Sequence, residues 1–120
     1  MATRSTIWYQ EEDGSFKGCY CHYDGYLSNN GKILLTSYNT FEKVKELVSR
    51  GGMSSLESDI SKINFYADEG EELNVFHAFS VITARQSFEE YNYFFIDGVW
   101  KYSLNDKTTL YELTEEPVKE

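Results

Sequence analysis

Near the C-terminal end of the chain, residues 91–104 read YNYFFIDGVWKYSL. Two hexapeptides rich in aromatic and β-branched residues flank Asp97-Gly98, a dipeptide that suits the two-residue type I′ turn of a β-hairpin. After the polar residues 105–107 comes TLYEL (109–113), which predicts a third strand beside the hairpin. This end of the chain therefore predicts an antiparallel sheet.

A second hairpin is predicted at the N-terminal end, where RSTIWYQ (4–10) and FKGCYCH (16–22) flank a turn at Asp13-Gly14. Side chains alternate along a strand, so each strand should present two different faces. The expected sets are Ser5, Ile7 and Tyr9 against Thr6, Trp8 and Gln10 on the first strand, and Cys19 and Cys21 against Tyr20 and His22 on the second.

The middle of the chain predicts helices. NTFEKVKELVSRGG (39–52) has a capping residue at Asn39, Glu42 three residues later, an apolar stripe and a Gly51-Gly52 stop. GKILL (31–35) favours a short helix, and MSSLESDISK (53–62) favours another turn or two. INFYA (63–67) and the run from 73 to 82 resemble strands, whereas residues 83–91 lean towards helix.

Together these elements predict an α+β fold, a small single domain over residues 1–120. Its antiparallel sheet is built from the N-terminal and C-terminal hairpins and is covered by one or two helices. Residues 113–120 are expected to be a frayed tail. We find no repeat, linker, signal peptide or apolar run long enough to span a membrane, and so expect a cytoplasmic protein.

Charge is distributed unevenly along the sequence. Residues 1–50 hold six acidic and six basic side chains, whereas residues 51–120 hold fourteen acidic and five basic ones, so the net charge of −9 arises in the second part. Such a chain repels bare nucleic acid and attracts basic surfaces, including protein channels that hold nucleic acid. The alternative reading of this charge is solubility alone.

Catalytic and metal-binding patterns are weak. Cys19, Cys21, His22 and His77 are zinc-ligand types, but a single residue between two cysteines on one strand does not match the usual spacing of a zinc site. Buried, reduced thiols are the simpler expectation. The adjacent carboxylate pairs resemble solvated surface charge. We therefore expect neither an enzyme nor a cofactor or metal site.

The octet CYCHYDGY (19–26) concentrates polar and aromatic groups at one end of the N-terminal hairpin. One reading is a structural corner, with a hydrogen bond between His22 and Asp24 and an unusual backbone angle at Gly25. The other is a pocket for a small anionic or nucleotide-like ligand. Its candidate ligand-binding residues are Arg4, His22, Asp24 and Tyr26.

Three blocks of sequence carry a resemblance to a known family: MATRSTI at the start, YCHYDGY with the following GKILL and SSL segments, and YNYFFIDGVWKY near the end. They resemble a family of small phage and prophage proteins that begin MATRSTI and contain a YCHWDGY-like block. Tyr23 stands where that family usually has tryptophan, and Cys19 where an aliphatic residue is common. The resemblance implies a phage or mobile-element setting, where small non-enzymatic proteins often block host defences.

Two functional hypotheses follow. The first is a counter-defence inhibitor of the anti-CRISPR kind, which mimics nucleic acid and binds a basic nucleic-acid channel of a host defence protein without binding nucleic acid or membrane itself. Its expected partner-binding residues are Asp68, Glu69, Glu71, Glu72, Glu89, Glu90 and Tyr91. The alternative is a homo-oligomeric sponge that sequesters a nucleotide second messenger with the hairpin-end residues.

Overall fold

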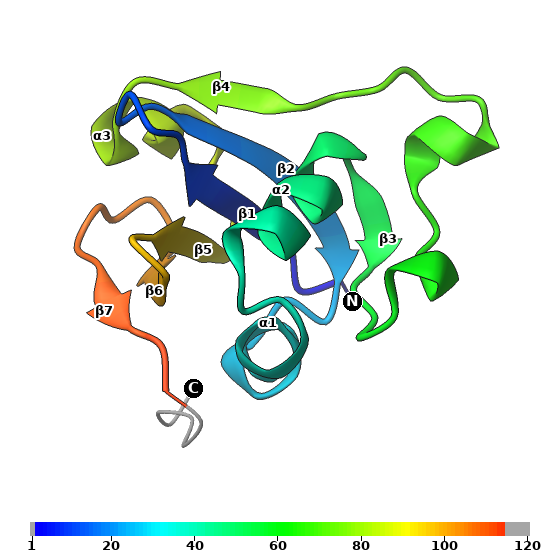
Figure 1. Cartoon of the computed structure of the whole chain (residues 1–120), viewed down its shortest axis with the longest axis horizontal. Coiled ribbons are helices and arrows are strands. Elements are labelled where there is room, and N and C mark those ends of the chain that lie inside the picture. The colour runs from blue at the N-terminus through cyan, green and yellow to red at the C-terminus, as the bar shows by residue number, and fades with distance from the viewer. Residues whose placement is uncertain (1, 115–120) are drawn as a thin grey trace.

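The computed structural model describes residues 2–114. It is an α+β domain with seven strands in one sheet, most of whose neighbours are antiparallel (Figure 1). The strands are β1 (Ser5–Gln10), β2 (Phe16–Tyr23), β3 (Met53–Ser55), β4 (Phe76–Ala78), β5 (Tyr91–Ile96), β6 (Val99–Leu104) and β7 (Tyr111–Glu112). The α-helices are α1 (Lys32–Ser37), α2 (Phe41–Ser49) and α3 (Val81–Ala84). The predicted fold class is confirmed.

Both predicted hairpins are present. β5 and β6 pair antiparallel with Ile96 opposite Val99, and the two residues between them have positive φ angles, 51° at Asp97 and 80° at Gly98. Positive φ at both central positions is the signature of a type I′ turn, which matches the right-handed twist of the strands. β1 and β2 pair antiparallel from Ser5–Cys21 to Gln10–Phe16, and β7 adds to β6 as predicted.

The two hairpins are joined by a parallel pair, which sequence patterns did not predict. β1 lies beside β5 in the order β3-β2-β1-β5-β6-β7, with Ser5 opposite Tyr91 and Tyr9 opposite Phe95. On the outer edge of β2, β3 pairs in parallel with the end of the strand and β4 pairs antiparallel with its start. β1 is thus the central strand that fixes both hairpins relative to each other.

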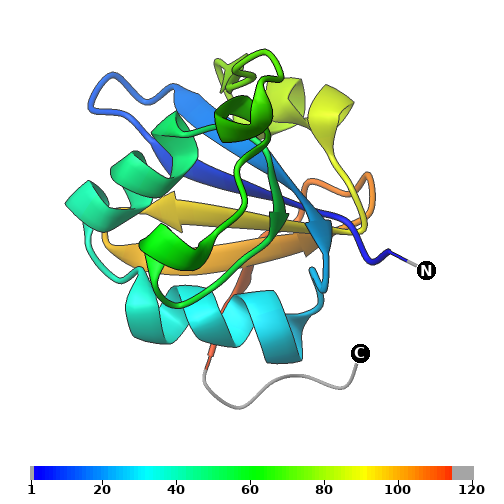
Figure 2. The ribbon, with the colours of Figure 1, turned by 90° about the vertical axis from the view of Figure 1, so that its right-hand side faces the viewer.

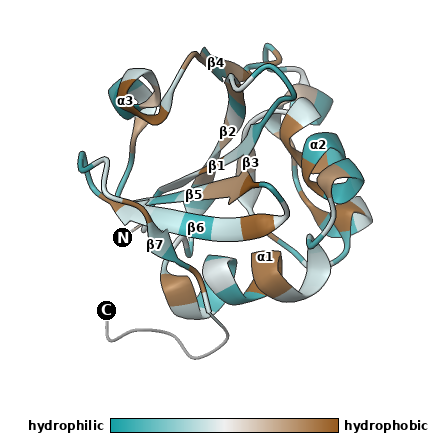
Figure 3. Cartoon of the chain, turned by 60° about the vertical axis from the view of Figure 1, so that its left-hand side comes forward, coloured by the Kyte–Doolittle hydropathy of each residue, from teal (hydrophilic) through white to brown (hydrophobic). Residues whose placement is uncertain are grey.

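Both faces of the sheet are covered. On one face, α1 and α2 close the main core, which contains Ile7, Tyr9 and Tyr93. On the other face, the segment around α3 covers a smaller core centred on Trp8 and Phe94, whose rings stack at 5.9 Å between centroids. Figure 3 shows α2 and α3 on opposite sides of the strands. The predicted alternation along β1 is confirmed for Ile7, Tyr9 and Trp8, which divide between the two cores.

α2 begins one residue later than its predicted cap implies. The side chain of Thr40, not Asn39, accepts a hydrogen bond from the backbone N–H of Lys43. Threonine is itself a good N-cap and is chemically similar in this role to the predicted asparagine. The helix ends before Gly51, whose φ of 84° is the left-handed angle typical of a helix stop. Of the predicted apolar stripe, Val44, Leu47 and Val48 are buried, whereas Phe41 is exposed.

Predictions for residues 53–91 are only partly correct. Met53–Ser55 form a strand instead of the predicted helical turn, although Ile60–Lys62 do form a 3₁₀ turn. INFYA (63–67) is wrong as a strand, because only Phe65 makes an isolated bridge, to Met53, before a 3₁₀ turn at Tyr66–Glu69. The strand predicted for residues 73–82 is reduced to β4, and the helical tendency of residues 83–91 appears as the end of α3 and a 3₁₀ turn at Arg85–Ser87.

The predicted frayed tail begins at Leu113, but this residue is packed in the main core and its N–H donates to the carbonyl of Trp100 at 3.0 Å. Ordered packing therefore reaches residue 113. The rest of the predicted tail, residues 115–120, lies outside the described residues.

Candidate partner-binding surface

A buried asparagine fixes the acidic residues before β5. The side-chain oxygen of Asn92 accepts hydrogen bonds from the hydroxyl of Thr6 at 2.7 Å and from the N–H of Glu89 at 2.8 Å. Its amide nitrogen donates to the carbonyls of Glu89 and Asn105, each at 3.0 Å. The indole of Trp8 completes the network by donating to Thr6 at 2.7 Å. Because every bond is buried or half-buried, Glu89 has a defined position at the entry to β5.

Glu90 connects this entry to the N-terminal segment. Its carboxylate accepts a hydrogen bond from the backbone N–H of Arg4 at 3.3 Å, and the N–H of Tyr91 donates to the Arg4 carbonyl at 3.3 Å. The parallel pairing of β1 and β5 places these residues together. Arg4 of the hairpin-end set and Glu90 of the acidic set, which were predicted separately, therefore meet where β1 and β5 begin.

Tyr20 lies beside these acidic residues on the solvent side of β2. Its phenol shares a 2.6 Å hydrogen bond with Nδ1 of His22. Partial burial raises the pKa of Tyr20; the nearby Arg4 lowers it and the negative charge of Glu89 raises it. Tyr20 is therefore close enough to both Arg4 and Glu89 to respond to their charges.

Asp68, Glu69, Glu71 and Glu72 are all exposed on the turn that follows Tyr66. Tyr66 packs over Gly52, where an added Cβ would lie 3.3 Å from its ring, and its N–H donates to the Gly52 carbonyl at 3.0 Å. Burial raises the pKa of Tyr66, and the nearby phenol of Tyr20 and the charge of Glu71 raise it further. Tyr66 thus links the acidic turn to Tyr20. In Figure 2 the turn lies at the top of the view and the entry to β5 at its right-hand side, near the N-terminus.

We call this surface the acidic face. It comprises Asp68, Glu69, Glu71, Glu72, Glu89 and Glu90, with Tyr20 and Tyr66 between the two acidic segments. Tyr91, which we predicted here, points the other way: it packs against the main core on the helical side of the sheet. Sequence reasoning missed Tyr66 because INFYA was assigned to a strand, and nothing in that stretch distinguishes a partly buried tyrosine from a core one.

The acidic face is partly neutralised. Arg50 forms an ion pair with Asp68 at 2.9 Å while its guanidinium lies 4.4 Å from the ring centre of Phe65. Among the ion pairs within residues 2–114, this is the only one that involves a carboxylate of the acidic face. Arg4 adds a second positive charge near Glu89. Five of the six carboxylates therefore stay without an ion-pair partner in the described part of the chain.

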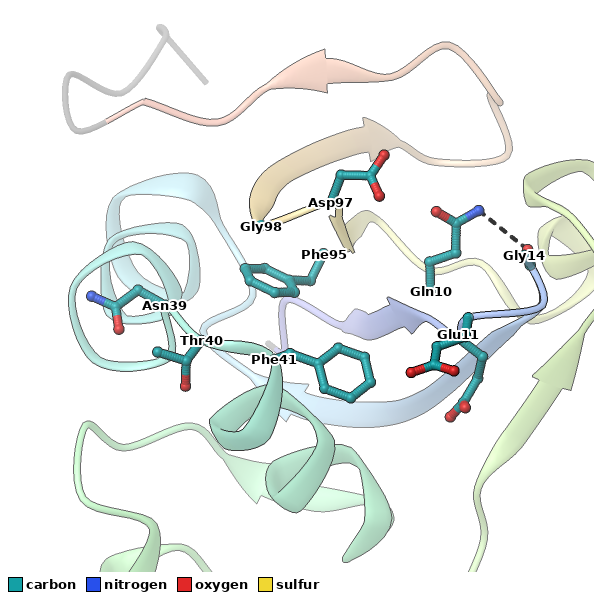
Figure 4. A pocket seen from close by; sticks show the side chains of 10 residues that line it. Gln10, Glu11, Gly14, Asn39, Thr40, Phe41, Phe95, Asp97 and Gly98 are labelled. Atoms are coloured by element: carbon teal, nitrogen blue, oxygen red, sulfur yellow. Dashed lines mark hydrogen bonds between the residues drawn. The ribbon is translucent and has the colours of Figure 1, made fainter.

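Other carboxylates lie elsewhere, so negative charge is not confined to the acidic face. Glu11, Glu12 and Asp97 line a cavity of about 470 Å³ between the β1–β2 turn, the β5–β6 turn and the start of α2 (Figure 4). Glu57 and Asp59 lie near Tyr38, where burial and these charges raise the pKa of the phenol to about 12. The uneven distribution of charge along the sequence therefore corresponds to several acidic surfaces in the fold rather than one.

The hairpin-end octet is a packed corner. Asp24, not Gly25, has the positive φ, 57°, and we predicted the reverse. Gly25 is needed for a different reason, since a Cβ there would lie 2.7 Å from that of Ser5. Its carbonyl accepts from the phenol of Tyr93 at 2.6 Å. The carbonyls of Asp24 and Tyr26 accept hydrogen bonds from the following turn, from Asn29 in both cases.

The remaining hairpin-end candidates are oriented by structural bonds. His22 is paired with Tyr20 rather than with the predicted Asp24. Arg4 is exposed, but its backbone is paired with β5 and it lies beside Glu89 and Glu90. The nucleotide-sponge hypothesis stays a prediction.

Cys19 and Cys21 are buried, free thiols that face the main core. Burial raises the pKa of both, and Asn30 and Ser5 contact the sulfur of Cys21 as hydrogen-bond partners. His22 lies on the opposite face of the strand, as alternation predicts. Within residues 2–114, no three side chains of the metal-ligating types come together.

Comparison of the chain with family models, with curated proteins and with solved structures gives no match. None of the helices in residues 2–114 has both the length and the apolar character needed to cross a membrane. The site must therefore be interpreted from its own geometry.

Proposed function

We propose that the protein acts by binding, and that its acidic face occupies a basic nucleic-acid-binding surface on a partner protein. In the phage setting implied by the sequence resemblance, the partner is a host defence protein and the effect is inhibition of the anti-CRISPR kind. The observation that supports this proposal is the exposed turn that carries Asp68, Glu69, Glu71 and Glu72, because among the described residues only Asp68 of these four forms an ion pair.

The chemistry suits a nucleic-acid mimic. Exposed carboxylates supply negative charge in place of phosphates, and a basic channel attracts them over a distance of about one Debye length, roughly 8–10 Å at physiological salt. Tyr20 and Tyr66 add aromatic surface with polar tips, a combination enriched in protein interfaces. The hydrogen bonds of Asn92 hold the Glu89 segment in place before binding, which reduces the entropy lost when the complex forms.

The test is capture of a partner from host lysate with the immobilised protein, followed by release with salt or with a DNA duplex. We expect to capture a partner that itself binds nucleic acid. Duplex DNA should displace this partner from the immobilised protein, and added salt should elute it. The variant D68K/E69K/E71K/E72K should lose this partner. A matched control, E12K/E42K/E57K/E112K, changes the charge by the same amount at exposed carboxylates outside the acidic face.

The comparison of these two variants separates a specific surface from net charge. Equal loss of capture by both variants would mean that only the overall charge of the chain matters. Undiminished capture by the acidic-face variant would contradict the proposal.

A further inference from the structure

A groove between α2 and the edge of the sheet is lined by two lysines and a histidine, and no carboxylate is among its lining residues. Its volume is about 430 Å³. The residues that line it are Tyr9, Lys17, Lys45, Val48, Ser49, Leu73, Val75 and His77. Basic side chains therefore converge here in a protein whose net charge is −9.

The floor of the groove is a row of side chains across three strands. Lys17 of β2 is directly opposite Tyr9 of β1 on one side and His77 of β4 on the other. Directly opposed residues share a face of the sheet and have Cβ atoms roughly 5 Å apart. This face is the one covered by α2, because Tyr9 belongs to the main core. The pairing register thus places Lys17 and His77 side by side beneath the helix.

The walls of the groove are largely apolar. Val48 of α2 and Val75 before β4 both pack on the main core. Leu73 lies over the stop of α2, where a Cβ added to Gly51 would be 2.8 Å from its Cδ1. More than half of the Leu73 side chain is nevertheless exposed, at 57%. The groove therefore combines apolar surface with charge at one side.

Neighbouring groups leave the groove with an excess of positive charge. Glu11 lies 3.7 Å from the ammonium of Lys17 and offsets part of its charge. Lys45 is exposed on α2 and its ammonium lies 5.8 Å from the ring centre of Phe41, with no ion pair among the described residues. Ser49 offers a hydroxyl on the same helix, although that hydroxyl also donates to the Glu46 carbonyl at 2.8 Å.

We propose that this basic groove binds a small organic anion with an apolar body, its carboxylate or phosphate held by Lys17, Lys45 and His77 and its body against Leu73 and Val75. The volume lies within the range of roughly 300–1,000 Å³ typical of small-molecule sites. This inference is independent of the acidic face.

The test is a titration followed by ¹H–¹⁵N NMR of the whole chain with three probes: 4-phenylbutyrate, phenyl phosphate and the neutral 4-phenyl-1-butanol. We expect saturable shifts at Lys17, Val75 and His77 with at least one anion, and binding of the alcohol that is about tenfold weaker. The anion that binds identifies the headgroup. The proposal is overturned if neither anion gives saturable shifts at millimolar concentration, or if the alcohol binds as tightly.

Two variants of α2 provide a matched pair. K45E reverses a charge in the groove and should weaken the anion about tenfold, whereas K43E makes the same change at an exposed lysine that lines a different cavity, and should leave affinity within about twofold. If K45E and K43E changed the affinity for the anion equally, the proposed groove site would be contradicted. His77→Ala supplies a second groove variant should K45E fail to fold. The acidic-face variant should bind the anion normally, so each proposal can fail alone.

Discussion

Gly18 lies directly beneath the indole of Trp8, and a Cβ at this position would be only 2.4 Å from the ring. Trp8 is completely buried and stacks on Phe94, so it has no free space to move into. We therefore expect Gly18→Ala to reduce the free energy of unfolding by about 2–4 kcal/mol through overpacking. Urea denaturation measures this change. A loss of less than about 0.5 kcal/mol, as for an ordinary surface substitution, would show that the indole is not fixed where we describe it.

Asn92 and Ser103 offer a contrast between a satisfied and an unsatisfied buried polar group. Asn92→Ala removes the acceptor for the buried Thr6 hydroxyl and for the N–H of Glu89, although Thr6 still accepts from Trp8, and it should cost about 2–4 kcal/mol. The hydroxyl of Ser103 is buried without a hydrogen-bond partner in the described residues. Ser103→Ala should therefore change stability by less than about 0.5 kcal/mol or increase it. Thermal unfolding of both variants provides the comparison, and a larger loss for Ser103→Ala would contradict the network.

The buried phenol of Tyr38 and the two buried thiols predict that the fold loses stability at alkaline pH. Folding raises the pKa of the Tyr38 phenol from 10.0 to about 12 and also raises that of both thiols above their ordinary value of 9.0. The unfolded state then releases protons first, so stability is complete below pH 9 and falls as pH rises from 9 towards 12. Tyr38→Phe should flatten the part of this fall above pH 10. Unfolding free energies at pH 8, 10 and 11 test this, and a constant value would contradict it.

At the level of elements, the N-terminal end of α2 tests whether Thr40 or Asn39 caps the helix. Thr40→Ala removes the side-chain acceptor for the N–H of Lys43 and should destabilise the fold by about 1 kcal/mol. Asn39→Ala should have almost no effect, although the sequence pattern favours Asn39. Chemical denaturation of the two single variants decides between them, and the reverse order would place the cap at Asn39.

Local patterns predicted the elements that depend on local chemistry. The Asp97-Gly98 turn, the alternation along β1 and the apolar stripe of α2 each arise from residues close together in sequence. The parallel pairing of β1 with β5 joins residues 86 positions apart, and neither strand carries a sign of its partner. Residues 53–55 and 63–67 were mispredicted because Met53 pairs with the distant strand β2 and Phe65 makes only an isolated bridge, and these contacts override weak local propensity.

The candidate site follows the same rule. Glu89 and the exposed turn at 68–72 could be identified as charged, but only the tertiary fold places them on either side of Tyr20. Tyr91 was included because it follows Glu90 in the sequence, but in β5 its side chain packs against the main core on the helical side of the sheet. The basic groove was not predictable at all, since Lys17, Lys45 and His77 come from three separate elements.

At the scale of the whole molecule, charge is divided among several surfaces rather than concentrated on one. The acidic face, the carboxylates around the cavity of Figure 4 and those near Tyr38 are separate, and the basic groove lies between α2 and β4. Long-range attraction to a basic partner would come from all carboxylates together, whereas specific contact would come from the acidic face alone.

Binding of the partner through the acidic face is tested most directly by the salt dependence of affinity for the captured partner. This dependence is measured for the natural chain, for D68K/E69K/E71K/E72K and for the control E12K/E42K/E57K/E112K. We predict that affinity for the natural chain falls steeply as salt rises, that the acidic-face variant binds weakly with a nearly flat dependence, and that the control keeps most of its affinity at physiological salt. Equal affinities for the two variants, or a natural chain whose binding does not respond to salt, would contradict the central claim.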